Sequence, residues 1–221
     1  MTRASWIAGL VFVAIAFGVT AWCYSALPAR IPQHWNIRGE LDGWGPRSSA
    51  WILPGVMLGI WILFRSLSAI SPRPFDLDRN SPALLTAMLA TVGLLGYLHL
   101  LTLWAATGHG VDIGRAMVGG VGASIALLGN RLGQIKRNLY VGVRTPWPLA
   151  SERVWSDTHR VAARWFVGAG VIGMIAILID LPAWAGLIPL IPAVVWPVAF
   201  SYLRYRKLER AGDLIEDPGA S

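Results

Sequence analysis

Charged residues are scarce in this chain of 221 residues: Asp, Glu, Lys and Arg together make up 14% of it, against about 25% in a typical soluble domain. So little charge excludes a disordered chain, which needs low hydrophobicity and high net charge. It also argues against a soluble globular enzyme, because the polar residues are too few to cover a core of this size. Cysteine is nearly absent, and the single Cys23 excludes an intramolecular disulfide framework and a multi-cysteine zinc site.

Apolar sequence is abundant instead. Hydrophobic residues form 55% of the chain, and the mean hydropathy is +0.53. A helix needs about 20 mainly apolar residues to cross a bilayer, and backbone groups in lipid must bond internally, which favours helices. We therefore predict an all-α fold, a polytopic membrane helical bundle of about six transmembrane helices. The predicted spans are Ser5–Tyr24, Ser49–Leu67, Pro82–Ala105, Arg115–Leu128, Ala162–Leu181 and Trp184–Leu203.

Two of these spans have unusual features. The fourth, Arg115–Leu128, is short and rich in glycine, so we expect it to extend into residues 129–134. Small residues there and in the fifth span allow close helix approach, which predicts that both pack against neighbouring helices rather than lipid. The first span is not expected to be a cleaved signal peptide, because its apolar core is longer than the usual stretch of about 7–15 residues.

The basic residues are distributed unevenly among the loops. Six spans place both termini, the loop 66–81 and the loop 131–161 on one side, and that side holds most of the 19 Lys and Arg residues. Short loops rich in Lys and Arg stay in the cytoplasm, so we expect cytoplasmic termini and an external loop at 25–48. The net charge of +7 then reflects membrane topology rather than direct binding of nucleic acid.

The external loop, residues 27–47, is more than a connector. Its prolines favour extended backbone, and its glycines permit tight turns. Because His34, Trp35 and Trp44 are unfavourable to leave without contacts, we predict an ordered loop folded back on the bundle. His34, Glu40 and Asp42 carry suitable donor atoms for a metal ion, but their spacing matches no zinc pattern, and no metal site is predicted.

A second unusual loop covers residues 129–160. The run 145–148, Thr-Pro-Trp-Pro, predicts a rigid turn, and Ser151 is placed to cap the next helix. We expect the face of that helix with Trp155 and Trp165 to lie on the membrane interface before the chain turns into the fifth span. Asn130 and Asn138 are expected to cap turns through local hydrogen bonds.

The second loop resembles the signature of the SdpI family, bacterial membrane proteins named for immunity to a secreted killing factor. The matching residues are Gly129-Asn130, Asn138, Gly142-Val143-Arg144-Thr145-Pro146-Trp147-Pro148-Leu149, Trp155 and Thr158-His159-Arg160. The first loop resembles a segment called DUF1648 that often precedes this signature. Its matching residues are Leu27-Pro28, Ile31-Pro32, His34-Trp35-Asn36, Gly39 and Asp42-Gly43-Trp44-Gly45. The resemblance divides the chain into a DUF1648-like segment at 1–70, an SdpI-like membrane domain at 71–205 and a polar cytoplasmic tail at 206–221.

The resemblance implies a protein of the bacterial inner membrane that is no enzyme, needs no cofactor, and works in toxin immunity or membrane signalling. Membrane lipids, a peptide toxin outside and a cytoplasmic repressor or regulator are the implied partners, with the two loops coupled through the fourth and fifth spans. In the second loop, the guanidinium of Arg144 could bind a phosphate or carboxylate through two parallel N–H hydrogen bonds. The candidate binding residues are Asn138, Gly142, Arg144, Thr145, Pro146, Trp147, Trp155, His159 and Arg160 in the second loop, and His34, Trp35, Asn36, Asp42 and Trp44 in the first.

Two alternative functions stay open. Ionisable groups in spans are functional hypotheses by default, so His99 and Asp180, with Asp112 and Arg115, could line an externally open polar cavity of a small-solute transporter or channel. The second alternative is a membrane enzyme that acts on lipid headgroups through Arg144 and His159, with Asp157 and Glu152 beside the histidine as a general-base arrangement. No nucleophile motif accompanies that histidine.

Overall fold

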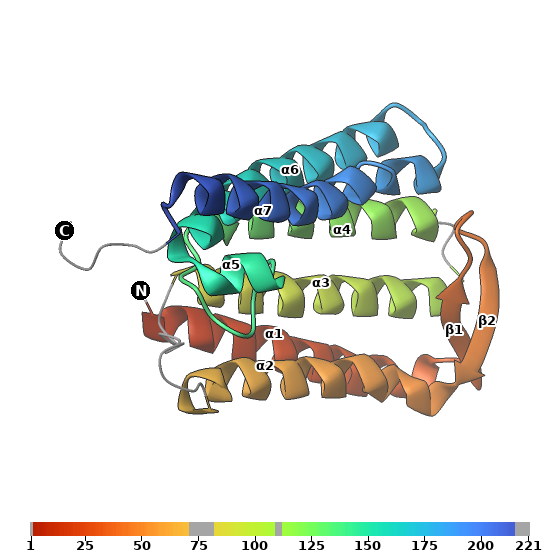
Figure 1. The fold of residues 1–221 in the computed structure, drawn as a ribbon. Coiled ribbons are helices and arrows are strands. Elements are labelled where there is room, and N and C mark those ends of the chain that lie inside the picture. The colour runs from red at the N-terminus through yellow and green to blue at the C-terminus, as the bar shows by residue number, and fades with distance from the viewer. Residues whose placement is uncertain (1, 71–81, 109–111, 215–221) are drawn as a thin grey trace.

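The computed structural model describes residues 2–70, 82–108 and 112–214. Six long helices lie side by side in a bundle, with a short helix and a two-stranded hairpin at opposite ends (Figure 1). The long helices are α1 (Thr2–Cys23), α2 (Ile52–Ile70), α3 (Pro82–Ala106), α4 (Ile113–Leu132), α6 (Glu152–Leu178) and α7 (Leu190–Ala211). The short elements are β1 (Arg30–Trp35), β2 (Leu41–Pro46), α5 (Pro146–Ala150) and the 3₁₀ turns η1 (Tyr24–Ala26), η2 (Arg47–Trp51) and η3 (Ala183–Leu187).

The helical membrane bundle is therefore confirmed. Helices α1, α2, α3, α6 and α7 are long and apolar enough to cross a bilayer. Helix α4 has 20 residues, and it ends at Leu132, inside the extension expected from the sequence. It is not among the described helices that are apolar enough to cross a bilayer, and it packs against α3 and α6.

The bundle has two groups of helices. Helices α1, α2 and α3 share one core, built on Trp6, Val13, Met57, Met88 and Val92. Helices α4, α6 and α7 form the second group, and α3 joins the groups by packing against α4 (Figure 1). This order makes α4 the central helix, with contacts to both halves of the protein.

Small residues bring α4 and α6 together, as the sequence predicts. A Cβ atom placed on Gly170 would collide with the carbonyl oxygen of Gly122 and lie 2.8 Å from the backbone nitrogen of Ala126. Such close backbone approach is the usual means of helix association in lipid. Helix α6 also packs against α7, but its outer face stays exposed at Val171, Ile172 and Ile175, so the expectation that this span avoids lipid is wrong for that face.

Gly170→Ala is expected to destabilise the protein by about 2 kcal/mol, because overpacking at a backbone contact forces two helices apart. The matched control is Gly168→Ala on the same helix, where an added Cβ meets nothing within 4 Å. This control should be neutral or stabilising, because alanine favours a helix interior by up to about 1 kcal/mol over glycine. Unfolding in detergent micelles measures both variants, and equal midpoints would contradict close packing between α4 and α6.

Helix α6 is one continuous helix from Glu152 to Leu178, so the expected turn between an interfacial helix and the fifth span is wrong. Ser151 does cap it, and accepts a hydrogen bond from the Val154 amide at 3.4 Å. The expected interfacial face is buried at Val154, Trp155 and Thr158. The signature loop, defined here as residues 133–151, covers that face. The apolar side chains at the start of α6 therefore pack against protein rather than against lipid.

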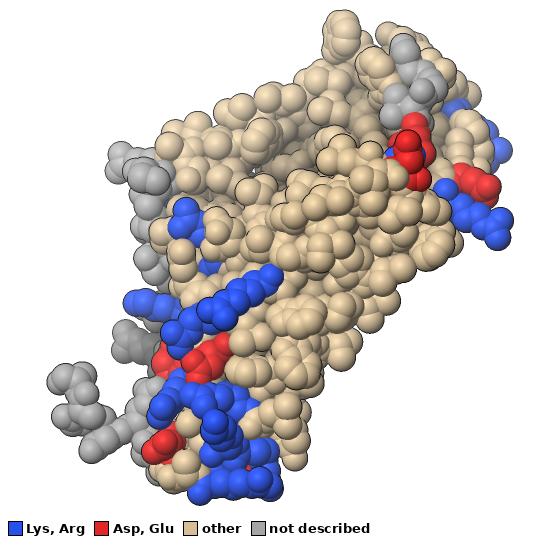
Figure 2. Space-filling model, turned by 90° about the horizontal axis from the view of Figure 1, so that it is seen from above, with Lys and Arg blue, Asp and Glu red and all other residues tan. Residues whose placement is uncertain are grey.

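The two tryptophan-bearing loops lie at opposite ends of the bundle. The start of α1, the end of α7 and the signature loop lie at one end, and the hairpin of residues 30–46 lies at the other (Figure 1). On the face shown in Figure 2, Lys and Arg gather toward the first end and an uncharged band covers the middle. We call the two ends the basic end and the hairpin end. The side chain of Arg3, the loop residues Arg73 and Arg79, and the tail residues Glu216 and Asp217 lie outside what the structure describes.

Candidate functional site

The hairpin is ordered by its own turn. Strands β1 and β2 pair antiparallel, with Arg30 opposite Pro46 and Trp35 opposite Leu41. At the turn, the Asn36 side-chain oxygen accepts hydrogen bonds from the amides of residues 38 and 40, at 2.9 and 3.1 Å. The expected ordered loop is confirmed, and pairing of its two extended arms is the detail that the sequence did not show.

The hairpin is held firmly on the bundle. Leu27 and Ile31 are buried in a small core with Leu103 of α3. At the tip, a Cβ placed on Gly39 would lie 2.9 Å from the Cα atom of Gly114, in the first turn of α4. Gly39 also has φ of +83°, a conformation that glycine adopts without strain. The hairpin tip therefore rests directly on the start of the central helix.

The outer side of the hairpin carries exposed polar and aromatic groups. His34 Nδ1 lies 2.5 Å from Asp42 Oδ1, whereas Glu40 accepts a hydrogen bond from Asn36 Nδ2 at 2.7 Å. The three possible metal ligands therefore do not converge, and no group of three such side chains occurs in the described part of the chain. Trp44 is 52% exposed and Ile37 is 73% exposed, while Trp35 is half-buried.

Asn138 organises the signature loop. Its side-chain oxygen accepts hydrogen bonds from the amides of Tyr140 and Val141 at 2.7 and 2.8 Å. Its side-chain nitrogen donates to the carbonyl oxygens of Lys136 and Val141 at 2.9 and 3.2 Å. The prediction that Asn138 caps a turn is thus confirmed. The same prediction for Asn130 is wrong, because Asn130 lies within α4 with its side chain exposed.

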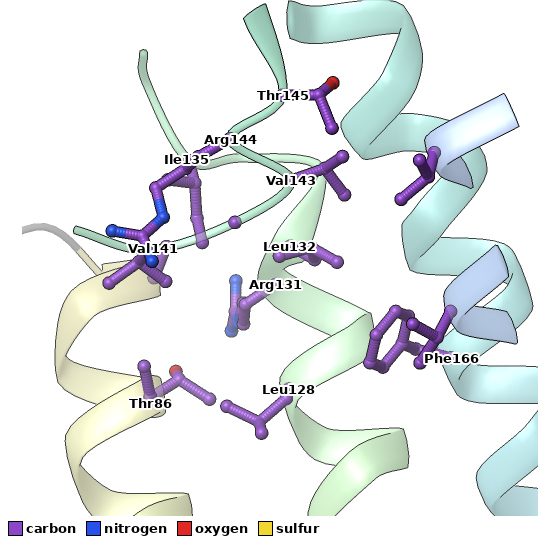
Figure 3. A pocket seen from close by; sticks show the side chains of 15 residues that line it. Thr86, Leu128, Arg131, Leu132, Ile135, Val141, Val143, Arg144, Thr145 and Phe166 are labelled. Atoms are coloured by element: carbon purple, nitrogen blue, oxygen red, sulfur yellow. The ribbon is translucent and has the colours of Figure 1, made fainter. Parts of the chain in front are cut away.

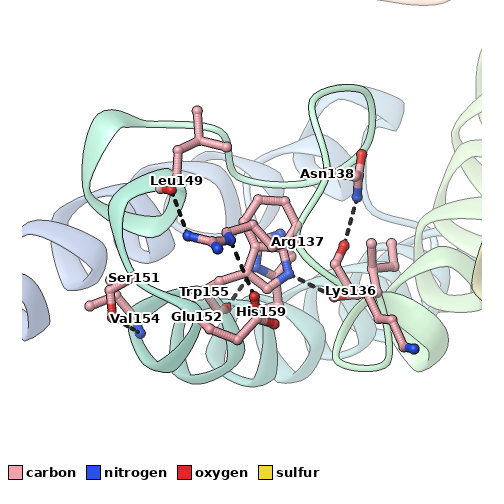
Figure 4. Close-up of polar contacts among 10 residues, drawn as sticks. Lys136, Arg137, Asn138, Leu149, Ser151, Glu152, Val154, Trp155 and His159 are labelled. Carbon is pink, nitrogen blue, oxygen red and sulfur yellow. Dashed lines mark hydrogen bonds and ion pairs between the residues drawn. The ribbon is translucent and has the colours of Figure 1, made fainter. Parts of the chain in front are cut away.

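His159 fastens the loop to α6 (Figure 4). Its Nδ1 donates to the carbonyl oxygen of Trp155 at 2.8 Å, and its Nε2 accepts the Val143 amide at 3.0 Å. The imidazole stacks on the Trp155 indole with ring centroids 4.0 Å apart, and the indole N–H donates to the Ile135 carbonyl oxygen at 2.6 Å. Gly142 passes over the imidazole with φ of +115°.

Ion pairs extend this framework to the neighbouring elements. Arg137 contacts a carboxylate oxygen of Glu152 at 3.2 Å and donates to the Leu149 carbonyl oxygen at 3.0 Å. Asp157 binds Arg160 at 2.7 Å and Arg204 of α7 at 2.6 Å. Sequence reasoning missed the ion pair of Arg137, because its carboxylate lies 15 positions further along the chain and no helical spacing links the two.

The remaining candidate residues of the signature loop differ in exposure: Arg144 and Pro146 are exposed, whereas Thr145 and Trp147 are half-buried. Pro146 begins α5, so the predicted rigid turn takes the form of a short helix. Thr145 Oγ1 lies 3.0 Å from Ser201 Oγ, and the Trp147 ring packs on Tyr202 with centroids 5.0 Å apart. Arg144 is exposed and donates a hydrogen bond to the Leu139 carbonyl oxygen.

A cavity of about 480 Å³ lies under the signature loop, between α3, α4, α6 and α7. Figure 3 shows the Arg131 side chain between α3 and α4, and the Arg144 side chain beside Val141. The other lining side chains are mainly apolar. Arg131 was not among the residues singled out from the sequence, because the cavity walls come from segments between residues 83 and 198 that only the fold brings together.

The geometry does not support the general base of the enzyme alternative. Both ring nitrogens of His159 have backbone partners, so neither is free to take a proton from a substrate. Glu152 and Asp157 are engaged by arginines instead of the histidine.

The polar groups of the transporter alternative gather only in part. His99 Nε2 lies 2.7 Å from Thr20 Oγ1 and joins α3 to α1, with both side chains buried. Asp180 lies 2.6 Å from Arg115 Nη2 at the hairpin end, where Asp112 is also near that arginine. The structure thus brings together three of the four residues that were expected to line a polar cavity, and places His99 elsewhere.

Comparisons with known proteins agree with this arrangement. Residues 11–58 match the family model of DUF1648, a domain of unknown function, and residues 134–202 match that of the SdpI/YfhL protein family. The Immunity protein SdpI of Bacillus subtilis (strain 168) is 30% identical over 166 residues, which are 75% of this chain and 78% of that protein. No solved structure matches the chain significantly. With a helical membrane bundle, a DUF1648 match over the hairpin and an SdpI match over the signature loop, the chain belongs to the SdpI/YfhL protein family.

Proposed function

We propose that this protein confers immunity to a secreted peptide toxin and reports the encounter across a bacterial inner membrane. In this proposal the hairpin faces outside, both termini and the signature loop face the cytoplasm, and no reaction is catalysed. The observation that carries the proposal is the contact between Gly39 of the hairpin and Gly114 of α4, because it links a solvent-facing aromatic surface directly to the central helix.

The hairpin supplies a surface suited to an amphipathic peptide. Trp44 and Ile37 are large, apolar and exposed, and aromatic side chains are enriched at the centres of protein interfaces. The ion pair of His34 and Asp42 and the side chains of Trp35 and Asn36 lie beside them on the same hairpin. These residues are the proposed contacts with the toxin.

Helix α4 supplies the route from that surface to the basic end. Its first turn touches the hairpin at Gly114, its middle packs on α6 at Gly122, and at Gly129 an added Cβ would lie 2.8 Å from the backbone nitrogen of Val167. A toxin bound to the hairpin transmits information only if it binds two arrangements of α4 with different affinity. Close backbone packing favours discrete arrangements over gradual deformation.

At the basic end, residues of the signature loop and of the start of α6 are the proposed contacts with a cytoplasmic regulator. Arg144 and Arg160 offer two exposed cations and Trp147 offers a half-buried aromatic ring, whereas Asn138, Gly142, Trp155 and His159 hold the loop in shape. A regulator would therefore meet a preorganised basic surface rather than a flexible loop.

Survival of toxin-sensitive Bacillus cells that lack their own immunity protein tests the proposal. Cells that express this chain should survive the secreted killing factor, and the double variant Trp44→Ala and Ile37→Ala should lower survival about tenfold or more, because it removes the exposed apolar anchors. The matched control is Trp22→Ala, an exposed tryptophan at the same end outside the hairpin, which should survive as the parent does.

Arg144→Ala tests the signature loop in the same cells and should also reduce protection at equal expression. Parent cells that die, or variants that survive unchanged, would contradict the proposed function. Equal loss in the Trp22→Ala control would contradict the assignment of the toxin surface to the hairpin.

A further inference from the structure

The cavity under the signature loop combines two kinds of wall. Its apolar part includes Leu128 of α4 and Phe166 of α6, and its polar part includes Arg131 and Arg144. Its volume of about 480 Å³ falls in the range of about 300–1,000 Å³ that is typical of small-molecule sites. A ligand that fits both walls has an apolar body and an acidic head.

The two arginines have no acidic partner in the described structure. Arg131 Nη1 donates to the neutral Gln134 Oε1 at 3.2 Å, and Arg144 donates to the backbone carbonyl oxygen of Leu139. At the same end, carboxylates pair with Arg137, Arg153, Arg160, Arg204 and Arg206. Arg131 is half-buried and Arg144 is exposed, so an anion can reach both, and a guanidinium binds phosphate oxygens with paired donors.

The cavity reaches the flank of the bundle that faces lipid. Val194 and Val198 of α7 line it, and they are 54% and 38% exposed on the apolar surface of a helix that can cross a membrane. An acyl chain can therefore enter from the bilayer without passing through water. A cytoplasmic peptide would have to reach this apolar flank from the charged end, which makes it the less suitable occupant.

We propose that the cavity binds an anionic phospholipid, with one acyl chain against Leu128, Phe166 and Val198 and the headgroup phosphate between Arg131 and Arg144. Thr86 of α3 and Thr145 also line the cavity, but their hydroxyl groups already donate to the Pro82 carbonyl oxygen and to Ser201 Oγ, so the two guanidinium groups are the donors to the headgroup. The lipid would join α3, α4 and α7 beneath the signature loop. The site shares Arg144 with the proposed regulator surface, but lipid binding does not require toxin immunity and is measured without toxin or regulator.

Native mass spectrometry of the full chain, purified in a neutral detergent, tests this proposal. Phosphatidylglycerol is the anionic probe, and phosphatidylcholine is the zwitterionic comparison. The parent should retain one phosphatidylglycerol more tightly than phosphatidylcholine. The double variant Arg131→Gln and Arg144→Gln should weaken phosphatidylglycerol binding about tenfold or more, because it removes charge-assisted hydrogen bonds.

The matched control removes two positive charges from the same end outside the cavity, by Lys136→Gln and Lys207→Gln. This control should change the affinity for phosphatidylglycerol less than about twofold. Leu128→Phe narrows the apolar part and should weaken binding of both lipids while the helical circular dichroism spectrum stays that of the parent.

Three results would overturn the proposal. Equal losses in the arginine and lysine double variants would mean diffuse attraction to the basic end. An unchanged affinity in folded Leu128→Phe would place the lipid outside the cavity. Retention of neither lipid by the parent would leave the cavity to another occupant.

Discussion

Gly142→Ala is expected to destabilise the protein by about 3 kcal/mol or more and to release the signature loop from α6. The residue has φ of +115°, in a region that residues with a Cβ atom occupy at a cost of about 1–3 kcal/mol. The added methyl group would also overlap His159 Nε2 and lie 3.0 Å from its Cδ2 atom. Two independent penalties therefore act at one position.

The steric overlap with His159 also affects the hydrogen bonds of that histidine. His159 is buried, stacks on Trp155 and accepts the Val143 amide, so it has no space into which it can move. If the imidazole is displaced, the Val143 amide loses its acceptor, and a buried donor without a partner costs about 1–3 kcal/mol. The loop should consequently open locally before the bundle unfolds.

Hydrogen exchange at the Val143 amide and unfolding in detergent micelles measure these two effects. Gly212→Ala is the matched control, because Gly212 has φ of +75° at the end of α7 and an added Cβ meets nothing within 4 Å there. The free energy of unfolding of this control should fall by only about 1 kcal/mol, because the left-handed backbone conformation is its one penalty. If both variants lost the same stability and Val143 stayed protected, close contact between Gly142 and His159 would be refuted.

The helices were predictable because a long apolar run crosses a bilayer as a helix, whose backbone groups bond to one another. The same reasoning failed at the start of α6, where Trp155 and Thr158 share an apolar face. Periodicity shows that such a face is buried but does not show what buries it. The loop that covers it precedes it in the chain, and the hydrogen bond from the Trp155 indole to Ile135 spans 20 residues.

Individual site residues were harder to assign than the loops that contain them. Asn130 and Asn138 look alike in the sequence, yet the end of α4 at Leu132 leaves Asn130 inside the helix and Asn138 beyond it. Arg131 was indistinguishable from other orienting charges until α3 and α7 were seen to form a cavity around it. The family resemblance identified the two loops that carry the candidate site. Only the burial of each side chain shows which residues stabilise a loop and which are exposed to a binding partner.

Asn138→Ala is expected to destabilise the protein by about 3 kcal/mol, because one buried side chain makes four hydrogen bonds to the backbone. Asn138 is 1% exposed, so water cannot replace the contacts with the Tyr140 and Val141 amides or with the Lys136 and Val141 carbonyl oxygens. A net contribution of about 0.5–1.5 kcal/mol for each bond supports this magnitude.

Asn138→Asp separates the two halves of that interaction. The aspartate keeps an acceptor for the Tyr140 and Val141 amides but presents no donor to the Lys136 and Val141 carbonyl oxygens, and it buries a charge. It should therefore also be destabilised while hydrogen exchange at both amides stays slower than in Asn138→Ala. The matched control is Asn130→Ala, at an exposed helical position, which should change stability by less than about 0.5 kcal/mol. Fast exchange of the Tyr140 amide in the parent, or equal stability of Asn138→Ala and Asn130→Ala, would show that the loop is held by other contacts.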